Sequence, residues 1–295
     1  MNPAPNNSPS PEALPASPPA QRLTFIGAGN MARSIIGGLV QTGYPADFIT
    51  ASAPTEVNLI PLNEKFGVHT LTDNHEAARN AEVLILSVKP QILQAVCEGL
   101  APELRHDPLI ITIAAGIDTE YINAWLGGKR KIIRCMPNTP ALVRQGASGL
   151  FANQSVSPEQ KEMANHIFSS VGITEWMEHE DQMHAITALS GSGPAYFFLI
   201  MEALEEAAQK AGIPAPSARK LAIQTMLGAA EMAKTSELSP AQLKKNVMSP
   251  GGTTEQAIKS FEENGIRELF DTALYAAVNR SRELSEILGK KASSV

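Results

Sequence analysis

The stretch Arg22–Ala32, RLTFIGAGNMA, constrains the fold more than any other part of the chain. An apolar run leads into two glycines spaced two apart, and a helical pattern over Met31–Gln41 follows directly. In this G-x-G-x-x-A pattern the first glycine permits a tight turn, and the second lets backbone N–H groups approach a pyrophosphate. Because the motif lies between a predicted strand and a predicted helix, it favours dinucleotide binding over an ordinary turn.

The bulk composition limits the possible partners. The 295 residues are enough for two domains, and a formal net charge of -6 argues against nucleic acid or an anionic membrane surface as the partner. No apolar run reaches the roughly 18 residues of a membrane span. Cys97 and Cys135 lie far apart in predicted buried elements, which fits free thiols in a reducing, cytoplasmic compartment.

The first 20 residues form a segment of their own, rich in Pro, Ser, Asn and Ala. They lack the basic start and apolar centre of a secretory signal. A segment of this composition buries too little apolar surface to offset its ordering entropy, so residues 1–20 are predicted to be a disordered tail.

Unbroken apolar runs alternate with helical patterns over the next part of the chain. The clearest are Val83–Val88, Leu109–Ala115 and Lys131–Met136, each followed by a polar or small-residue break. Such runs indicate parallel strands covered on both faces, hence an α/β sheet. A short strand from Gly146, a helix after Pro158 and a strand near Ile173–Met177 are expected to form the far edge of that sheet.

From about Asp181 onward the pattern becomes almost entirely helical. We therefore expect a dinucleotide-binding domain over residues 21–180 and an all-helical domain over 181–295. The expected helices are 195–211, 217–235, 240–247, 254–263 and 266–288. The first of these is apolar on most of its circumference, which predicts burial in a core or between subunits. The preceding Ser190–Gly193 segment is either a functional loop or a plain hinge.

A second short strand is expected over Asp47–Ala53, followed by a helix through about Phe66, and the end of this strand bears on the choice of cofactor. A carboxylate at this position binds a ribose 2′-hydroxyl and repels a 2′-phosphate. This chain has Ser52 there, with Thr55 nearby, and both hydroxyls could donate to a phosphate. The pattern favours NADPH over NADH, although no Arg or Lys follows closely and Glu56 stands near.

In an open α/β sheet, ligands bind beyond the carboxyl ends of the strands. The breaks at Val88–Pro90, Ala114–Gly116 and Pro137–Pro140 are therefore candidate cofactor contacts. Lys89 either reaches a cofactor phosphate or ribose, or ends a strand in solvent. Asn138 either orients the nicotinamide ribose or forms a turn before Pro140, and the structural role is favoured.

A second glycine-rich turn, Asn246–Thr254, lies far along the chain and reads NVMSPGGTT. Gly251 and Gly252 followed by Thr253 and Thr254 mark a helix start with several free N–H groups. That arrangement suits the carboxylate of a small substrate, although an ordinary N-cap would have the same pattern.

No metal site is predicted. His179 and His184 superficially resemble a zinc-binding helix, but they are five residues apart rather than the four that place both on one face. The sequence also contains no G-x-S-x-G elbow and no Walker lysine.

Five motifs together resemble the Δ1-pyrroline-5-carboxylate reductase family. They are residues 25–32 (FIGAGNMA), 88–90 (VKP), 134–140 (RCMPNTP), 189–196 (LSGSGPAY) and 249–254 (SPGGTT). The first two occur in other reductases, whereas the last three are specific to this family in their order and spacing. The resemblance extends from about Leu23 to Leu288.

The resemblance implies a Rossmann-type domain followed by an all-α domain that forms an interlocked homodimer, with dimers often assembled into a decamer. It implies NAD(P)H-dependent reduction of pyrroline-5-carboxylate to proline, without settling NADPH against NADH. The cofactor residues it implies are Ile26, Gly27, Ala28, Gly29, Asn30, Met31, Ser52, Pro54, Asn74, Ser87, Val88, Lys89, Pro90, Ile113, Ala114, Ala115 and Asn246.

The resemblance also places Glu180, Thr253 and Thr254 at the substrate, the last two from the partner subunit. Ser249, Gly251 and Gly252 complete the expected substrate turn. We expect the Thr254 hydroxyl to contact the ring nitrogen, as a hydrogen-bonding and orienting group rather than a strong acid.

Two other functions fit parts of the pattern. A β-hydroxyacid dehydrogenase would place a catalytic Lys on the first long helix of the second domain, but the first Lys there is Lys210, near the helix end. A non-catalytic nucleotide sensor on the same scaffold would bind the cofactor without turnover, so an activity assay separates such a sensor from a reductase.

Overall fold

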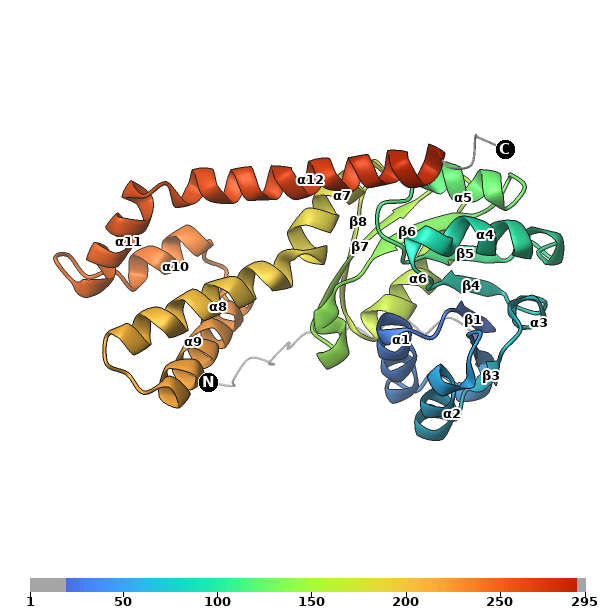
Figure 1. Cartoon of the computed structure of the whole chain (residues 1–295), viewed down its shortest axis with the longest axis horizontal. Helices are drawn as coiled ribbons and strands as arrows, with labels where there is room; N and C mark the ends of the chain where they lie inside the picture. Colours follow the sequence, from blue (N-terminus) through green and yellow to red (C-terminus); the bar gives the residue numbers. More distant parts are fainter. Residues whose placement is uncertain (1–19, 291–295) are drawn as a thin grey trace, which may run out of the picture.

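In the computed structural model, which describes residues 20–290, a single eight-stranded sheet forms the N-terminal body of the protein. The strand order is β3-β2-β1-β4-β5-β6-β7-β8 (Figure 1). All neighbouring strands are parallel except β6 and β7. The strands are β1 Leu23–Ile26, β2 Ile49–Ser52, β3 His69–Leu71, β4 Val83–Leu86, β5 Leu109–Thr112, β6 Ile132–Met136, β7 Gly146–Ala152 and β8 Gly172–Trp176.

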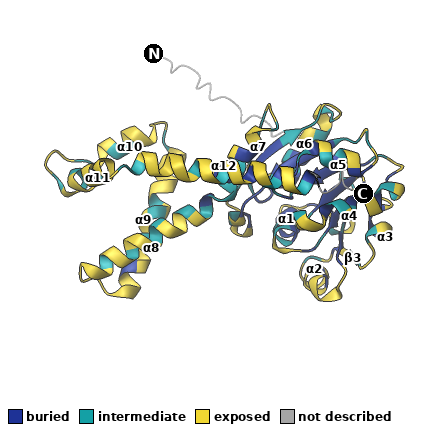
Figure 2. Ribbon diagram, turned by 45° about the horizontal axis from the view of Figure 1, so that its top comes forward, coloured by how far each residue is buried: buried dark blue, intermediate teal, exposed yellow. Residues whose placement is uncertain are grey.

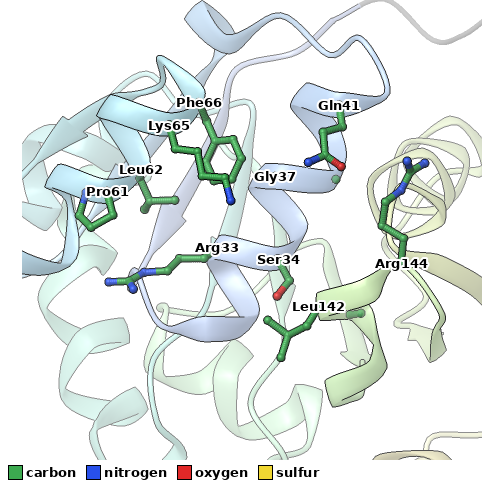
Figure 3. A pocket seen from close by; sticks show the side chains of 12 residues that line it. Arg33, Ser34, Gly37, Gln41, Pro61, Leu62, Lys65, Phe66, Leu142 and Arg144 are labelled. Atoms are coloured by element: carbon green, nitrogen blue, oxygen red, sulfur yellow. The ribbon is translucent and has the colours of Figure 1, made fainter.

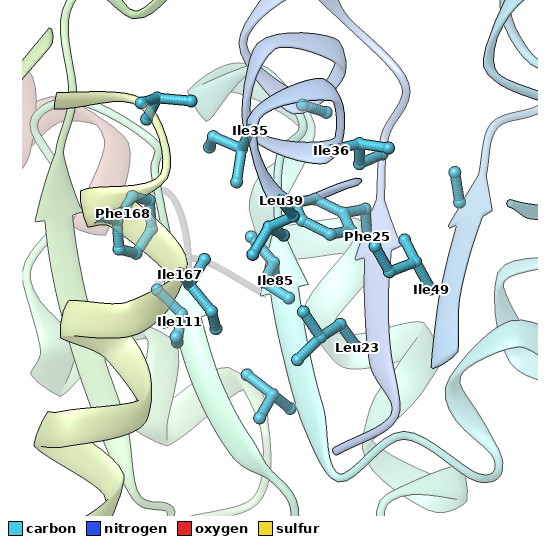
Figure 4. Close-up of a cluster of buried hydrophobic side chains, with 14 of the residues drawn as sticks. Leu23, Phe25, Ile35, Ile36, Leu39, Ile49, Ile85, Ile111, Ile167 and Phe168 are labelled. Carbon is cyan, nitrogen blue, oxygen red and sulfur yellow. The ribbon is translucent and has the colours of Figure 1, made fainter. Parts of the chain in front are cut away.

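The central strands are buried on both faces, as the unbroken apolar runs predicted. Every residue of β1, β4 and β5 is buried, and successive side chains pack into opposite layers. Phe25 and Ile85 belong to one core cluster, shown in Figure 4, whereas Ile26 and Leu86 belong to a second cluster. The sheet therefore lies between two separate hydrophobic layers, which confirms the predicted α/β class.

Helices cover both faces of this sheet. The helices α1 Asn30–Gln41, α2 Ile60–Phe66 and α6 Pro158–Ser169 contribute to the first core cluster. The helices α3 Asn74–Ala78, α4 Pro90–Leu100 and α5 Thr119–Trp125 contribute to the second. Short 3₁₀ turns join the elements: η1 Ala46–Phe48, η2 Glu56–Asn58, η3 Ala101–Glu103 and η4 Thr139–Val143.

Two local expectations differ from the structure. The second strand covers only Ile49–Ser52, because residues 46–48 form the 3₁₀ turn η1 rather than the start of the strand. The helix expected to run on to Phe66 is divided into η2 and α2, with Pro61 in the first turn of α2. Pro is favoured there because it lacks the N–H that a helix start leaves unpaired.

After β8 the described chain is helical. The segments are α7 Gln182–Ile186, the π-helix η5 Thr187–Gly191, α8 Gly193–Lys210, α9 Ala215–Thr235, α10 Pro240–Asn246, α11 Thr253–Glu263 and α12 Ile266–Lys290. Figure 1 shows α8 to α11 projecting from the sheet, with α12 running back along the molecule to α5. The helix starts predicted at Ser217, Pro240 and Ile266 agree within two residues with the observed starts at Ala215, Pro240 and Ile266.

Helix α8 is not buried within this chain. Phe197, Phe198 and Leu199 are 56–63% exposed, and Leu204 is 46% exposed. In Figure 2 most of α8 and α9 is drawn as exposed. The sequence predicted that this apolar helix is buried either in a core or between subunits. The exposed side chains exclude burial in a core of this chain.

The structure also bears on the predictions about the cysteines, membrane spans and the N-terminal tail. Cys97 and Cys135 are buried free thiols, and burial raises the pKa of Cys97 to about 12. Within residues 20–290, no helix is long and apolar enough to cross a membrane. The predicted tail, apart from Ala20, and the last five residues lie outside the described part of the chain.

Candidate active site

The glycine turn after β1 is wedged between the ends of two neighbouring strands. The Gly27 N–H donates to Ser52 O of β2 at 2.8 Å, and Gly27 has a φ of 107°. A Cβ at Gly27 would come within 2.6 Å of Ser87 O, so a side chain is excluded both by backbone conformation and by space. This contact sets the position of the turn against β2 and β4.

The start of α1 offers an open anion site. Gly29 is its N-cap, with no side-chain cap, and α1 has no acidic residue in its first turn. A Cβ at Gly29 would meet nothing within 4 Å. The N–H groups of the first helical turn have no partners within a helix, and here a phosphate can approach them closely.

The predicted residues at the end of β2 contact each other. The Ser52 hydroxyl donates to Asn74 Oδ1 at 2.7 Å, and Ser52 is fully buried. Without a ligand, the Ser52 proton is used within the chain, and donation of this hydroxyl to a cofactor phosphate stays a prediction. Ser52 fixes the orientation of the Asn74 amide, while Pro54 is exposed in the following loop.

The ends of β4 and β5 bring further predicted residues to the same edge. Ser87 N–H donates to Ile26 O at 2.8 Å, and Ile113 N–H donates to Leu86 O at 3.1 Å. The Ser87 hydroxyl is buried and has no hydrogen-bond partner among the described residues. An unpaired buried hydroxyl beside an open glycine turn fits a bound nicotinamide dinucleotide, whose polar groups could satisfy it.

The sequence left two roles open for each of Lys89 and Asn138, and the structure shows where both residues lie. Lys89 is exposed at the N-cap of α4, immediately before Pro90. Asn138 is buried, donating to Ser190 O at 3.0 Å and accepting from Ala147 N–H at 2.9 Å. Asn138 therefore has the structural role that the sequence favoured, joining η4, β7 and the π-helix.

The second glycine turn leads into α11 as predicted. Gly251 has a φ of 70°, and Gly252 is the N-cap of α11. The Gly251 N–H donates to the Glu255 carboxylate at 2.6 Å, so this group is not free for a substrate within the present chain. Among the described residues, the N–H groups of Thr253 and Thr254 have no acceptor.

The two glycine turns lie at opposite ends of the molecule. Figure 1 shows α10 and α11 at the tip of the helical arm and β1 with α1 within the sheet body. The structure thus brings residues 26–31, 52, 54, 74, 87–90 and 113–115 to one edge of the sheet. Asn246 and Ser249–Thr254 are far from that edge within one chain, because the arm extends away from the body.

Glu180 lies with neither turn but at the junction of sheet and arm. Its carboxylate accepts from Thr119 N–H at 2.6 Å and from Thr119 Oγ1 at 2.7 Å. Arg134, only 2% exposed, donates to Asp118 and lies 3.4 Å from Glu180 Oε1. The sequence motifs did not reveal this cluster, although an Arg inside the apolar strand 132–136 was a usable signal.

His184 extends the same polar junction toward α12. Its Nδ1 lies 2.9 Å from Ser281 Oγ, and its Nε2 lies 3.9 Å from Asp118 Oδ1. Burial, reinforced by the positive charge of Arg134, lowers the pKa of His184. No group of three or more His, Cys, Asp or Glu side chains within residues 20–290 could hold a metal ion.

A doubly wound sheet with a glycine turn, an open helix start and an unpaired hydroxyl at its carboxyl edge is typical of nicotinamide-dependent oxidoreductases. Comparison with known proteins agrees. Residues 22–116 match the family described as NADP oxidoreductase coenzyme F420-dependent, and residues 180–284 match pyrroline-5-carboxylate reductase dimerisation. The helical part is therefore a region of self-association.

Individual relatives cover nearly the whole described chain. A pyrroline-5-carboxylate reductase of Pseudomonas aeruginosa is 52% identical over 269 residues, covering 91% of this chain and 98% of that protein. The solved reductase of Coxiella burnetii is 50% identical with a TM-score of 0.87, covering 90% and 99%. The Plasmodium falciparum reductase, solved with NADP bound, is 31% identical with a TM-score of 0.80, covering 90% and 98%. The chain belongs to the pyrroline-5-carboxylate reductase family.

Proposed function

We propose that the protein reduces Δ1-pyrroline-5-carboxylate to L-proline, with NADPH as the preferred reductant and NADH as the alternative. The start of α11 is the observation that carries the substrate assignment. It presents the free N–H groups of Thr253 and Thr254, and the neighbouring Gly251 N–H already binds a carboxylate, that of Glu255. A helix start with two free N–H groups fits the carboxylate of a small amino-acid-like substrate.

The chemistry requires positioning more than strong acid or base catalysis. The nicotinamide supplies a hydride, and a protonated C=N group accepts hydride at carbon more readily than a neutral one. Helix α11 would hold the substrate carboxylate at its N-terminus, and the Thr254 hydroxyl would hydrogen-bond the ring nitrogen. Because a hydroxyl is a weak acid, Thr254 orients the ring nitrogen rather than protonating it unaided.

We further propose that each active site combines two chains in an interlocked homodimer, with dimers able to assemble into a decamer. Within one chain the Ser249–Thr254 turn lies far from the sheet edge, while α8 and α9 expose a row of apolar side chains. Pairing these helices with a second copy would bury that surface. It would also carry Asn246 and Ser249–Thr254 of one chain to the cofactor of the other.

In this scheme the two parts of the chain have different tasks. Residues 21–180 would bind the cofactor and residues 181–295 would form the dimer and hold substrate. Glu180 lies at the boundary between the two parts. Because its carboxylate oxygens are bound by Thr119 and Arg134, we propose that Glu180 lines the substrate site rather than taking part in the reaction. Buried free thiols at Cys97 and Cys135 support a cytoplasmic location.

The assay that tests this function follows cofactor oxidation by purified protein with pyrroline-5-carboxylate, using NADPH and NADH in parallel. We expect turnover with both and a higher kcat/KM with NADPH. Reactions without the pyrroline provide the control. Nucleotide binding without turnover would establish the non-catalytic sensor instead, and turnover only with a β-hydroxyacid would establish a dehydrogenase.

A further inference from the structure

The loop that follows β2 has no basic residue of its own. Residues 53–58 contain Glu56 but no Arg or Lys, yet this loop borders the ribose 2′ position in doubly wound sheets. A cation reaches it from α1. Arg33 donates through Nη2 to Asn58 O at 3.1 Å and to Asn58 Oδ1 at 3.2 Å.

Arg33 is held rigidly without being neutralised. Its Nε donates to Ala28 O at 3.1 Å, so Ala28 and Asn58 together engage three of its five N–H groups. These acceptors are neutral, and no carboxylate within residues 20–290 forms an ion pair with Arg33. The two N–H groups of Nη1 have no acceptor in that same part of the chain. The result is an oriented guanidinium with an uncompensated charge.

Thr55 adds a hydroxyl donor to the same loop. The Asn58 side-chain amide donates to Thr55 Oγ1 at 3.1 Å, which leaves the Thr55 proton free to donate elsewhere. Asn58 thus connects Thr55 and Arg33 in one hydrogen-bonded row. Such a row matches the acceptor oxygens of a phosphate monoester, to which Arg can donate two bonds from one planar group.

We infer that Arg33, with Thr55, binds the 2′-phosphate of NADP(H) and sets the preference for it over NAD(H). This inference rests on the nicotinamide cofactor of the proposed function and names the residue that selects it. The cation that the β2 loop lacks is thereby supplied by α1, the helix that follows the Gly27–Gly29 turn. Asn58 and Ala28 would orient it in advance, which lowers the entropic cost of binding the phosphate.

The neighbouring cations have different positions and provide controls. A pocket of about 310 Å³ between α1, α2 and η4 is lined by Arg33, Lys65 and Arg144 among others. In Figure 3 the Arg33 guanidinium points away from Leu142 and Arg144. Lys65 Nζ lies 5.3 Å from the Phe66 ring, and Arg144 Nε donates to Ser170 O at 3.2 Å. Neither forms a hydrogen bond with the β2 loop within residues 20–290.

The test measures nucleotide binding by calorimetry, with NADP⁺, NAD⁺, 2′,5′-ADP and 5′-AMP as probes. Arg33→Gln removes the charge but keeps an amide that can bond Asn58. We expect its Kd for NADP⁺ and 2′,5′-ADP to rise at least about tenfold, with less than about a twofold change for NAD⁺ and 5′-AMP. Arg33→Lys should give an intermediate loss, and the matched control Lys65→Gln should bind all four probes as wild type does.

Two outcomes would overturn the inference. Unchanged NADP⁺ affinity in Arg33→Gln would show that the guanidinium does not contact the phosphate. An equal loss for NADP⁺ and NAD⁺ would show a structural role at the Ala28 turn instead. Binding requires no turnover, so a wild-type protein that failed to reduce pyrroline-5-carboxylate would refute the proposed function and leave this result standing.

Discussion

Thr119 donates both its backbone N–H and its hydroxyl to Glu180, at 2.6 Å and 2.7 Å. The two residues belong to different halves of the protein, since Thr119 begins α5 on the sheet and Glu180 precedes the helical arm. A negative charge at a helix N-terminus is stabilised by the helix dipole and by the unpaired N–H groups there. The contact therefore ties the base of the arm to the cofactor-binding body, with Arg134 buried beside it.

Removing Arg134 should destabilise this junction strongly. Arg134→Met would leave the carboxylates of Asp118 and Glu180 without their buried partner, so we expect the free energy of unfolding to fall by about 3–5 kcal/mol. Urea denaturation at fixed protein concentration measures the loss. Arg22→Met is the matched control, because its pair with Glu82 is largely exposed and should contribute under about 1 kcal/mol. Equal losses in the two variants would contradict the role assigned to Arg134.

His184 should make stability depend on pH in the weakly acidic range. Its folded-state pKa is lowered from 6.5 mainly by burial, so between that lowered value and 6.5 the unfolded chain binds more protons. Stability must then fall as the pH drops below about 6.5. His184→Gln, which can still bond Ser281, is expected to flatten this part of a pH series of unfolding midpoints. An unchanged slope would exclude His184 as its source.

Gly27 and Gly29, the two glycines of the turn after β1, should respond differently to substitution by alanine. Gly27→Ala places a Cβ within 2.6 Å of Ser87 O at a φ of 107°, so we expect loss of stability together with loss of cofactor binding. In Gly29→Ala the new Cβ would meet nothing within 4 Å. The free energy of unfolding of this variant should therefore lie within about 0.5 kcal/mol of the wild-type value. Its Kd for cofactor should nevertheless rise, because a methyl group would obstruct the pyrophosphate. Calorimetry with thermal melts separates the two effects.

An active site shared between two chains predicts complementation. Thr254→Ala should lower kcat/KM with unchanged cofactor affinity, and Thr254→Ser should retain most activity because it keeps the hydroxyl. Mixing subunits of Thr254→Ala with subunits of Gly29→Ala should restore about a quarter of wild-type activity, since half the dimers are mixed and each has one intact site. Mixtures no more active than their components would show that each site uses one chain alone.

Much of the fold could be predicted because local patterns determine it. The glycine turn, the apolar strands and the helix starts predicted at Ala195 and Thr254 each depend on a few adjacent residues. The structure has these helix starts at Gly193 and Thr253, within one or two positions. Burial of the strands on both faces also followed from their unbroken apolar runs. Sequence patterning alone therefore determined the α/β class, the succeeding helical region and the residues gathered at the carboxyl edge.

The tertiary structure decided how distant residues pair. Sequence did not reveal that Ser52 donates to Asn74, that Arg33 reaches the β2 loop from α1, or that Glu180 caps α5 beside Arg134. Each contact joins elements whose separation in space depends on the packing of the whole sheet. The distance between the two glycine turns likewise depends on the direction in which the arm leaves the body, which no local pattern encodes.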